Sequence, residues 1–200
     1  MERHDFESRP NLLPYDGVVN YHGVITGSAE ADSYFKKLID NIDWQNDEVT
    51  VFGKRHVMKR QTAWYGDEPF AYTYSNATKT ALPWTPELSA LKSIVEKCSG
   101  ESYNSCLLNL YNDGSEGMGW HSDDEKTIAK NSAIASMSFG ATRRFAFKHK
   151  KSKENVSILL EHGSLLVMKG ETQTHWLHSI PKSVKVKDLR INLTFRTFQQ

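Results

Sequence analysis

The segment RINLTFR, residues 190–196, alternates polar and apolar side chains without a break. Successive side chains of a β-strand point to opposite faces of the sheet, so this alternation predicts a strand with one apolar face. That face carries Ile191, Leu193 and Phe195. The other face carries Arg190, Asn192, Thr194 and Arg196. The strand therefore offers one side to a core and presents two positive charges on the other.

The two arginines of this strand suit a ligand that is negatively charged at both ends. Six steps of about 3.3 Å separate the backbones of Arg190 and Arg196 by roughly 20 Å. Both side chains are long, however, and strand twist helps them to lean toward each other. Guanidinium groups bind carboxylates through paired, charge-assisted hydrogen bonds. The pattern favours a site for a small dicarboxylate, with an outer edge strand and solvated arginines as the alternative.

Short strand patterns also precede this segment. They cover residues 103–111, 133–139, 143–149, 156–161 and 164–168. Turn residues separate them, at Asp113-Gly114, Gly140, Gly163 and Gly170. Such a succession of short strands is typical of a β-sandwich or a jelly roll.

Two helices are expected before these strands. In residues 28–42 the apolar positions Phe35, Leu38, Ile39 and Ile42 recur at helical spacing, with Ser28 as a plausible N-cap. The second helix begins with Thr85-Pro86-Glu87, which offers a cap, a proline at the first helical position and an acid in the first turn, and Gly100 stops it. The prediction is an α+β fold in which N-terminal helices support a sheet.

Length and composition favour one globular domain over residues 1–200. The chain has 200 residues, 38% of them hydrophobic and 24% charged, which is enough for a sizeable core. About the first ten residues are expected to be disordered. No apolar run approaches the roughly 18 to 20 residues of a membrane span, so we expect a soluble, non-secreted protein without membrane contact. Cys98 and Cys106 match no metal or redox motif.

The charge distribution says more than the net charge of +1. Acidic residues crowd one segment: Asp113, Glu116, Asp123, Asp124 and Glu125. Basic residues gather elsewhere, at Lys54, Arg55, Lys59 and Arg60, at residues 143–153, and at Lys182, Lys185 and Lys187. Clustered basic residues can follow a phosphate backbone, although runs of this length are also common on solvated surfaces.

A metal site is indicated within the acidic segment. His121 and Asp123 are two residues apart, so in an extended segment both side chains reach the same side. A third ligand is available from either His175 or His178, and the residues alone leave that choice open. Two imidazoles and one carboxylate on one face are the set with which non-haem oxygenases hold Fe(II) and keep other coordination positions open.

Five ordered segments resemble the AlkB family of nucleic-acid oxidative demethylases. They are residues 109–111, 121–125, 136–140, 178–181 and 190–196, and the resemblance covers about residues 45–198. Further similarity at residues 51–54, 65–67, 72–75 and 162–166 is greatest to the duplex-preferring branch typified by the second human homologue. The resemblance implies a double-stranded β-helix, or jelly-roll, core and a nucleotide-recognition lid over about residues 45–80.

The resemblance also implies the cofactors and their ligands. Fe(II) would be held by His121, Asp123 and His178, and 2-oxoglutarate and O2 would be co-substrates. Arg190 would meet the distal carboxylate of 2-oxoglutarate and Arg196 would lie near its other end. Asn109, Tyr111 and Asn192 would add hydrogen bonds to the same molecule.

The resemblance assigns further residues to an alkylated base. Tyr74 would stack the flipped base against His121, with Tyr72 and Ser75 lining the lid. Glu125 would face the exocyclic amine of the base. Val51 and Phe52 match a finger that fills the vacated position in the duplex, and Lys54, two residues later, is also expected to contact the substrate. The basic side chain that assists flipping could be Lys59 or Arg60, because the segment 55–60 is one residue shorter than in the relative.

The function that follows is repair of N1-methyladenine and N3-methylcytosine in double- and single-stranded DNA. Methylation at these nitrogens gives a cationic base that pairs poorly, so its extrusion costs less than that of an intact pair. An RNA demethylase with the same chemistry is one alternative. A non-catalytic nucleic-acid-binding protein with a vestigial site is another. We expect a monomer, cytoplasmic if the source is bacterial and nuclear if it is eukaryotic.

Overall fold

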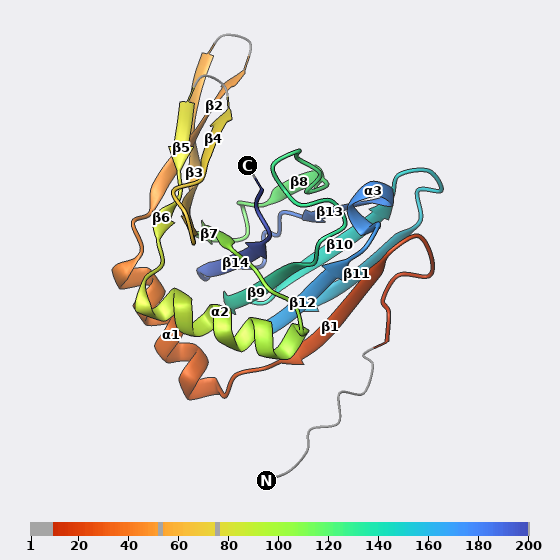
Figure 1. The fold of residues 1–200 in the computed structure, drawn as a ribbon, viewed down its shortest axis with the longest axis horizontal. Helices are drawn as coiled ribbons and strands as arrows, with labels where there is room; N and C mark the ends of the chain where they lie inside the picture. Colours follow the sequence, from red (N-terminus) through yellow and green to blue (C-terminus); the bar gives the residue numbers. More distant parts are fainter. Residues whose placement is uncertain (1–9, 52–53, 75–76, 200) are drawn as a thin grey trace.

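A computed structural model describes residues 10–51, 54–74 and 77–199, and their side chains outside residues 47–56 and 72–78 (Figure 1). Two antiparallel sheets face each other. The major sheet has eight strands, seven of them in the order β1(Val18–Val24), β12(Ser164–Lys169), β9(Ile134–Gly140), β14(Arg190–Arg196), β7(Ser105–Tyr111), β3(Lys54–Gly66) and β2(Gln45–Val51). The eighth strand, β6(Leu82–Pro83), pairs with β3 in parallel.

The minor sheet has four strands. Their order is β11(Asn155–Leu160), β10(Arg143–His149), β13(Trp176–Ile180) and β8(Met118–His121). A separate two-stranded ribbon consists of β4(Ala71–Tyr74) and β5(Ala77–Thr80). The two facing sheets make the jelly-roll core of an α+β fold, as the sequence predicts.

Strand β14 lies in the middle of the major sheet, between β9 and β7, rather than at an edge. Its apolar face, Ile191, Leu193 and Phe195, is fully buried in the larger core cluster. The same cluster includes Leu38 from α1(Ser28–Asn41) and Leu88 from α2(Pro86–Ser99), so the helices cover this face of the sheet (Figure 1). The polar face of β14 consequently turns toward the minor sheet, where a second, smaller core cluster lies.

The predicted second helix is confirmed with its caps. Thr85 is the N-cap, and its Oγ1 accepts a hydrogen bond from the amide of Leu88 at 3.3 Å. Pro86 opens the helix, and Gly100 ends it with a left-handed φ of 70°. The first helix also forms, but its N-cap is Gly27 and it makes no side-chain capping bond. The expectation that Ser28 caps this helix is therefore wrong, because Ser28 is already helical.

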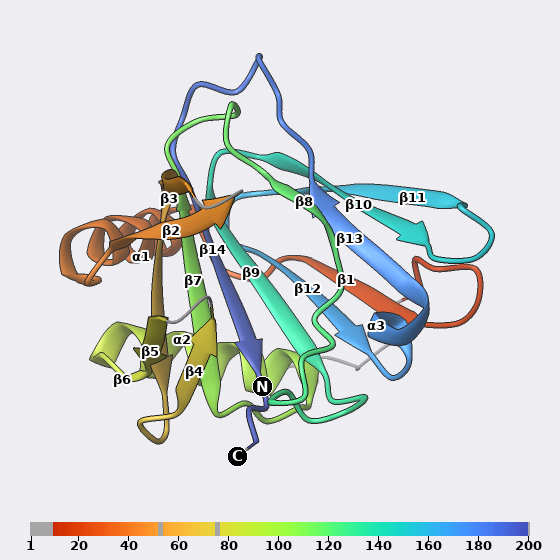
Figure 2. The same cartoon turned by 90° about the horizontal axis from the view of Figure 1, so that it is seen from above.

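The order of elements differs from the expectation of helices first and strands afterwards. Strand β1 precedes α1, and β2 to β6 lie between the two helices. Strands β1 and β2 lie at the two edges of the major sheet, and β4 and β5 form a separate ribbon, so these strands do not show the regular alternation of the central strand β14. In β3, residues 61–66 pair with β7, and residues 54–57, 61 and 62 pair with β2. Strands β2 and β3 form one end of the major sheet, and in Figure 1 this end extends, with the β4–β5 ribbon, beyond the rest of the molecule; Figure 2 shows the same fold from above.

A third helix, α3(Thr172–His175), is a single turn between β12 and β13 and was not predicted. Across the described part of the chain, no helix is long and apolar enough to cross a membrane.

Candidate active site

A pocket opens between the inner faces of the two sheets. Residues from β7, β8, β9, β10, β12, β13 and β14, together with Asp123, form its wall: Leu107, Asn109, Tyr111, Met118, His121, Asp123, Ser136, Phe145, Met168, His178, Ile180, Asn192, Thr194 and Arg196. Nine of these fourteen side chains are polar, and they converge from both sheets. The apolar ones, among them Met118, Phe145 and Met168, were not assigned from the sequence because their contribution depends on how the two sheets face each other.

Strand pairing brings the predicted metal ligands together. His178 in β13 is the register partner of His121 in β8, and the two rings have centroids 4.2 Å apart. Asp123 follows β8 by two residues. Its Oδ1 lies 3.6 Å from Nε2 of His121 and 3.9 Å from Nε2 of His178. One potential ligand atom from each residue lies within 4.8 Å of the others, which suits a single metal ion.

The tautomer of His121 leaves a lone pair for that ion. Its Nδ1 lies 2.9 Å from the carbonyl oxygen of Gly119. A carbonyl oxygen only accepts, so Nδ1 carries the proton and Nε2, which faces Asp123, is unprotonated in the neutral ring. A backbone carbonyl that orients the ring through the other nitrogen is a regular companion of metal-binding histidines.

The electrostatics of the cluster keep Asp123 charged and His178 neutral. Burial alone raises the pKa of Asp123, but Arg196, His178 and His121 outweigh it and lower this pKa to about 2. Burial lowers the pKa of His178 to about 4, although Asp123 opposes the change. At neutral pH the cluster therefore offers one carboxylate and an imidazole lone pair, the forms that a divalent metal requires.

Arg196 is tied to Asp123 rather than standing free in the pocket. Its Nε and Nη2 donate to Oδ2 of Asp123 at 3.0 and 2.6 Å. This pair leaves Oδ1 for the two histidines. No local sequence pattern indicates this pair, because its members are 73 positions apart.

Arg190 is completely buried beside two residues that line the pocket. Its Nη2 donates to Ser138 Oγ at 2.9 Å and to Asn192 Oδ1 at 2.8 Å, and its guanidinium lies 5.5 Å from the ring centroid of Tyr111. Burial lowers the pKa of Arg190 to about 10, so it is still cationic at neutral pH. Within the described residues its Nε and Nη1 have no hydrogen-bond partner. Unsatisfied donors on a buried cation are costly, and a carboxylate would satisfy them.

The two asparagines of the pocket differ in whether their side-chain oxygen already accepts a hydrogen bond. Asn192 accepts from Arg190 and Ser136 and donates to Thr194, so it organises neighbouring side chains. Asn109 is buried, and its Oδ1 has no hydrogen-bond partner among the described residues. Asn109 is therefore the one with an open acceptor at the pocket wall.

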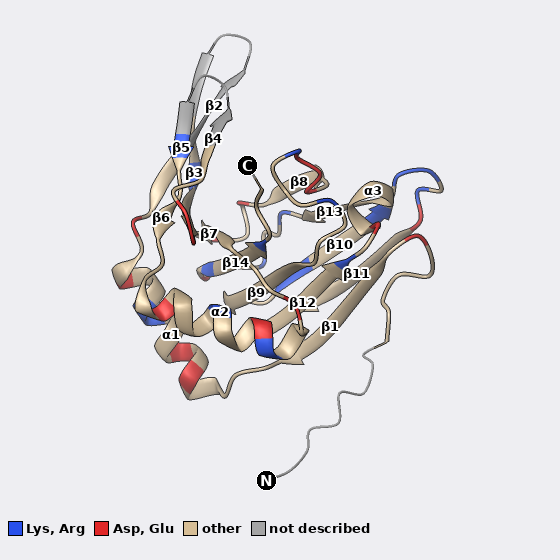
Figure 3. Cartoon of the chain, in the orientation of Figure 1, with Lys and Arg blue, Asp and Glu red and all other residues tan. Residues whose placement is uncertain are grey.

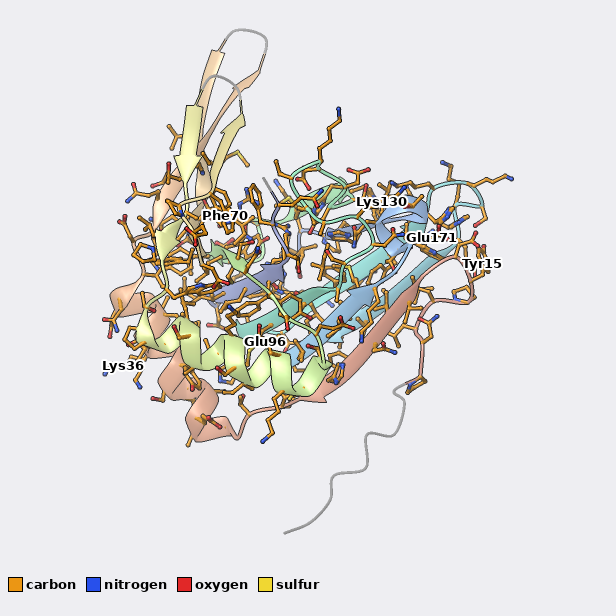
Figure 4. The ribbon with its side chains drawn as sticks, in the orientation of Figure 1. Tyr15, Lys36, Phe70, Glu96, Lys130 and Glu171 are labelled. Carbon is orange, nitrogen blue, oxygen red and sulfur yellow. The ribbon has the colours of Figure 1, made fainter. Side chains whose placement is uncertain are left out.

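His175 belongs to a different cluster at the far end of the minor sheet. It lies near His149 and Asp16, and the labelled side chains Tyr15 and Glu171 mark this end of the molecule (Figure 4). His149 Nδ1 accepts from the amide of Ser152 at 3.0 Å, so its proton is on Nε2, which faces Asp16 Oδ2 at 3.3 Å. This arrangement turns the Nε2 proton toward the Asp16 carboxylate and leaves no free lone pair at Nε2. Of the two candidate histidines, His178 is thus the one beside His121 and Asp123.

The structure describes only some of the residues predicted to contact a base. Phe52 and Ser75 lie outside the described residues. Val51, Lys54, Tyr72 and Tyr74 lie in strands β2 to β4, but their side chains are also outside the description. Glu125 is exposed in the loop after Asp123. It lies near enough to Arg196 to add, after Asp123, to the rise in the pKa of Arg196.

Of the two candidate flipping residues, Lys59 is exposed. Arg60 Nη1 lies 3.4 Å from Sδ of Met118, so this side chain joins β3 to the pocket wall. The geometry does not select between them, and both stay as predictions.

Comparison with known proteins identifies the family of this chain. The model of the 2OG-Fe(II) oxygenase superfamily matches residues 17–196. Mouse DNA oxidative demethylase ALKBH2 is 42% identical over 195 residues, covering 92% of this chain and 82% of the mouse protein. Human ALKBH2 is 41% identical, covering 90% and 74%. Bovine alpha-ketoglutarate-dependent dioxygenase alkB homolog 3 is 43% identical, covering 84% and 62%.

A solved structure titled "The structure of OsALKBH1" shares the fold. Its TM-score is 0.63 at 17% identity, covering 92% of this chain and 98% of that one. The family match and the ALKBH2 relatives together establish that this chain belongs to the AlkB family within the 2OG-Fe(II) oxygenase superfamily, dioxygenases that use Fe(II), 2-oxoglutarate and O2.

Proposed function

We propose that this protein is a DNA oxidative demethylase that repairs N1-methyladenine and N3-methylcytosine in duplex and single-stranded DNA. One observation carries the proposal: His121, Asp123 and His178 converge at a pocket beside a buried arginine with unsatisfied donors. The 42% identity to mouse DNA oxidative demethylase ALKBH2 supports the substrate class.

The residues present fit the cofactors of the family. His121, Asp123 and His178 would hold Fe(II), which with 2-oxoglutarate and O2 supplies the oxidising chemistry. Arg190 would bind the distal carboxylate of 2-oxoglutarate, with Asn109 and Tyr111 at the same end of the pocket. Arg196 would lie near the other end of 2-oxoglutarate and would keep Asp123 ionised and oriented, since its Nε and Nη2 donate to that carboxylate.

The two oxygen atoms of O2 end in different products. One oxygen atom of O2 enters succinate as 2-oxoglutarate loses CO2, and the other converts the N-methyl group to N-hydroxymethyl. The N–C bond then breaks as the hydroxyl group loses its proton to solvent, which releases formaldehyde and returns the bonding electrons to the ring nitrogen as a neutral lone pair. Apolar walls from Phe145, Met168 and Ile180 limit water around the reacting atoms.

Selection of the substrate would begin with its charge. A methylated adenine or cytosine is cationic, and the exposed Asp124 and Glu125 follow directly after Asp123. Tyr74 of the lid would stack on the base, a contact worth roughly 1 to 3 kcal/mol. The turn that joins β10 to β11 carries the exposed Lys151 and Lys153 and would lie near phosphates (Figure 3).

Formaldehyde release from methylated oligonucleotides tests this function. Release from methylated duplex DNA should require both iron and 2-oxoglutarate, and Asp123→Ala should abolish it while the protein stays folded. A preference for RNA of tenfold or more over duplex DNA would make the protein an RNA demethylase instead. Binding of DNA without succinate formation would indicate a vestigial site. We also expect a monomer, nuclear in a eukaryotic cell and cytoplasmic in a bacterial one.

A further inference from the structure

The backbone at Asp123 lacks a strand partner of its own. Strand β8 ends at His121, and the chain then leaves the minor sheet. Asp123 is nevertheless buried, with 4% of its surface exposed. A buried amide needs a hydrogen-bond partner, and here Oε1 of Gln173 accepts from the Asp123 amide at 2.9 Å. The Gln173 side chain thus supplies the acceptor that a neighbouring strand would otherwise provide.

Gln173 comes from an element directly linked to the other buried ligand. It lies in α3, the single turn that leads into β13 and so to His178. Its Nε2 lies 3.4 Å from Sδ of Met168, which lines the pocket. Gln173 therefore joins the segment that carries Asp123 to the strand that carries His178, immediately behind the pocket wall.

Lys150 adds a second connection between the same two segments. Its Nζ donates to the carbonyl of Gln173 at 2.8 Å and to Ser122 Oγ at 3.0 Å. It also lies 3.7 Å from Oδ2 of Asp124. The loop after β8 is thereby fixed on both sides of Asp123, by Gln173 at the amide and by Lys150 at the neighbouring residues.

We propose that Gln173 is a positioning residue for the iron site, which sets the place of the Asp123 carboxylate through its backbone amide. The proposal rests on the metal-binding role of Asp123 stated above. Arg196 fixes the Asp123 side chain at Oδ2, and Gln173 fixes the main chain, so Oδ1 stays between the two histidines. Without the Gln173 acceptor, the buried amide would be unsatisfied and the loop would shift to reach water.

Co(II) binding to the iron site provides the test, since Co(II) reports affinity and ligand geometry through its visible absorption. Gln173→Met keeps the length of the side chain but removes the acceptor, and Gln173→Glu keeps an acceptor oxygen. We expect Gln173→Met to weaken Co(II) binding by about 10- to 100-fold, the usual cost of losing a group that orients a metal ligand. Its Co(II) spectrum should change, while Gln173→Glu should keep the wild-type spectrum.

Two controls separate positioning from general stability. Thr174→Ala, an exposed neighbour in α3, should bind Co(II) as the wild type does. The melting temperature of each metal-free variant shows whether it folds. Wild-type Co(II) affinity and spectrum in Gln173→Met would overturn the proposal, as would an equal spectral change in Gln173→Glu. If Asp123→Ala bound Co(II) as well as the wild type, the proposed iron site itself would be wrong, and this inference would fall with it.

Discussion

A single carboxylate organises this site. Asp123 is buried between one permanent cation and two imidazoles, and its amide is bound from a third direction. Burial of a charge is costly unless it is paired and hydrogen-bonded, and each of these partners offsets part of that cost. The same contacts that stabilise the ionised form also aim it, so charge and geometry are fixed together.

Arg190 should control the affinity for 2-oxoglutarate. We expect Arg190→Met to raise the KM for 2-oxoglutarate by 10-fold or more, because a charge-assisted pair to a carboxylate is lost. Steady-state succinate formation at varied 2-oxoglutarate concentration measures this change. Arg144→Met, an exposed arginine on β10, is the matched control and should keep the wild-type KM. An unchanged KM in Arg190→Met would remove this arginine from the co-substrate site.

Acid should destabilise the metal-free protein through His178. Burial lowers its pKa from 6.5 to about 4 in the folded state. Between these pH values the unfolded chain binds a proton at His178 that the folded protein does not. The free energy of unfolding is therefore highest above pH 6.5 and falls as the pH approaches 4. The loss should be about 3 kcal/mol. Urea unfolding across this pH range measures it.

The comparison for this prediction is a variant without the titrating group. His178→Gln should lose most of the pH dependence between 6.5 and 4, whereas His175→Gln, outside the pocket, should keep it. A slope in His178→Gln equal to that of the wild type would contradict the assignment.

At the scale of helices and strands, the elements that could be predicted are those whose sequence shows a clear local pattern. Strand β14 and helix α2 were predicted because alternation and caps are written within a few residues. The strands β1 to β3 were missed because their sequences do not alternate polar and apolar residues as regularly as β14 does. The choice between His175 and His178 was open for the residues alone, since it depends on the register of β13 against β8, which no local pattern encodes. Gln173 was missed because α3 is too short to show a helical period.

Helix α2 should depend on its N-cap. Thr85→Ala removes the acceptor for the Leu88 amide and should lower the free energy of unfolding by about 1 kcal/mol. Chemical denaturation monitored by circular dichroism measures the change. Ser89→Ala, exposed one turn later in the same helix, should cost nothing. Equal stabilities of the two variants would argue against the capping bond.

The lid should matter more for duplex than for single-stranded substrates. Phe52 is predicted to fill the space that a flipped base leaves, a space that exists only in a duplex. Phe52→Ala should therefore reduce kcat/KM on methylated duplex DNA more than on the single strand. Val57→Ala, an exposed apolar residue on β3, is the control. An equal loss on both substrates would remove the wedge role.

At the scale of the whole molecule, the pocket belongs to both sheets, so its ligands should stabilise the entire fold. At about 100 times its Kd a ligand adds about 2.7 kcal/mol, which corresponds to roughly 5 to 10 °C in melting temperature for a chain of this size. We expect this shift with 2-oxoglutarate in the presence of Co(II), measured by calorimetry. Arg190→Met should keep the Co(II) shift and lose the 2-oxoglutarate shift. A full 2-oxoglutarate shift in that variant would place the co-substrate elsewhere.

The position of β8 at the edge of the minor sheet has a consequence for how iron enters and leaves. His121 ends a four-residue strand that pairs with β13 alone in that sheet and has an irregular register there, whereas Asp123 and His178 are buried. Fraying of this short strand would release one ligand and leave two in place. Iron exchange should then proceed through local opening, without global unfolding, and amide hydrogen exchange at residues 118–121 should be faster than in β13 and should slow when metal is bound.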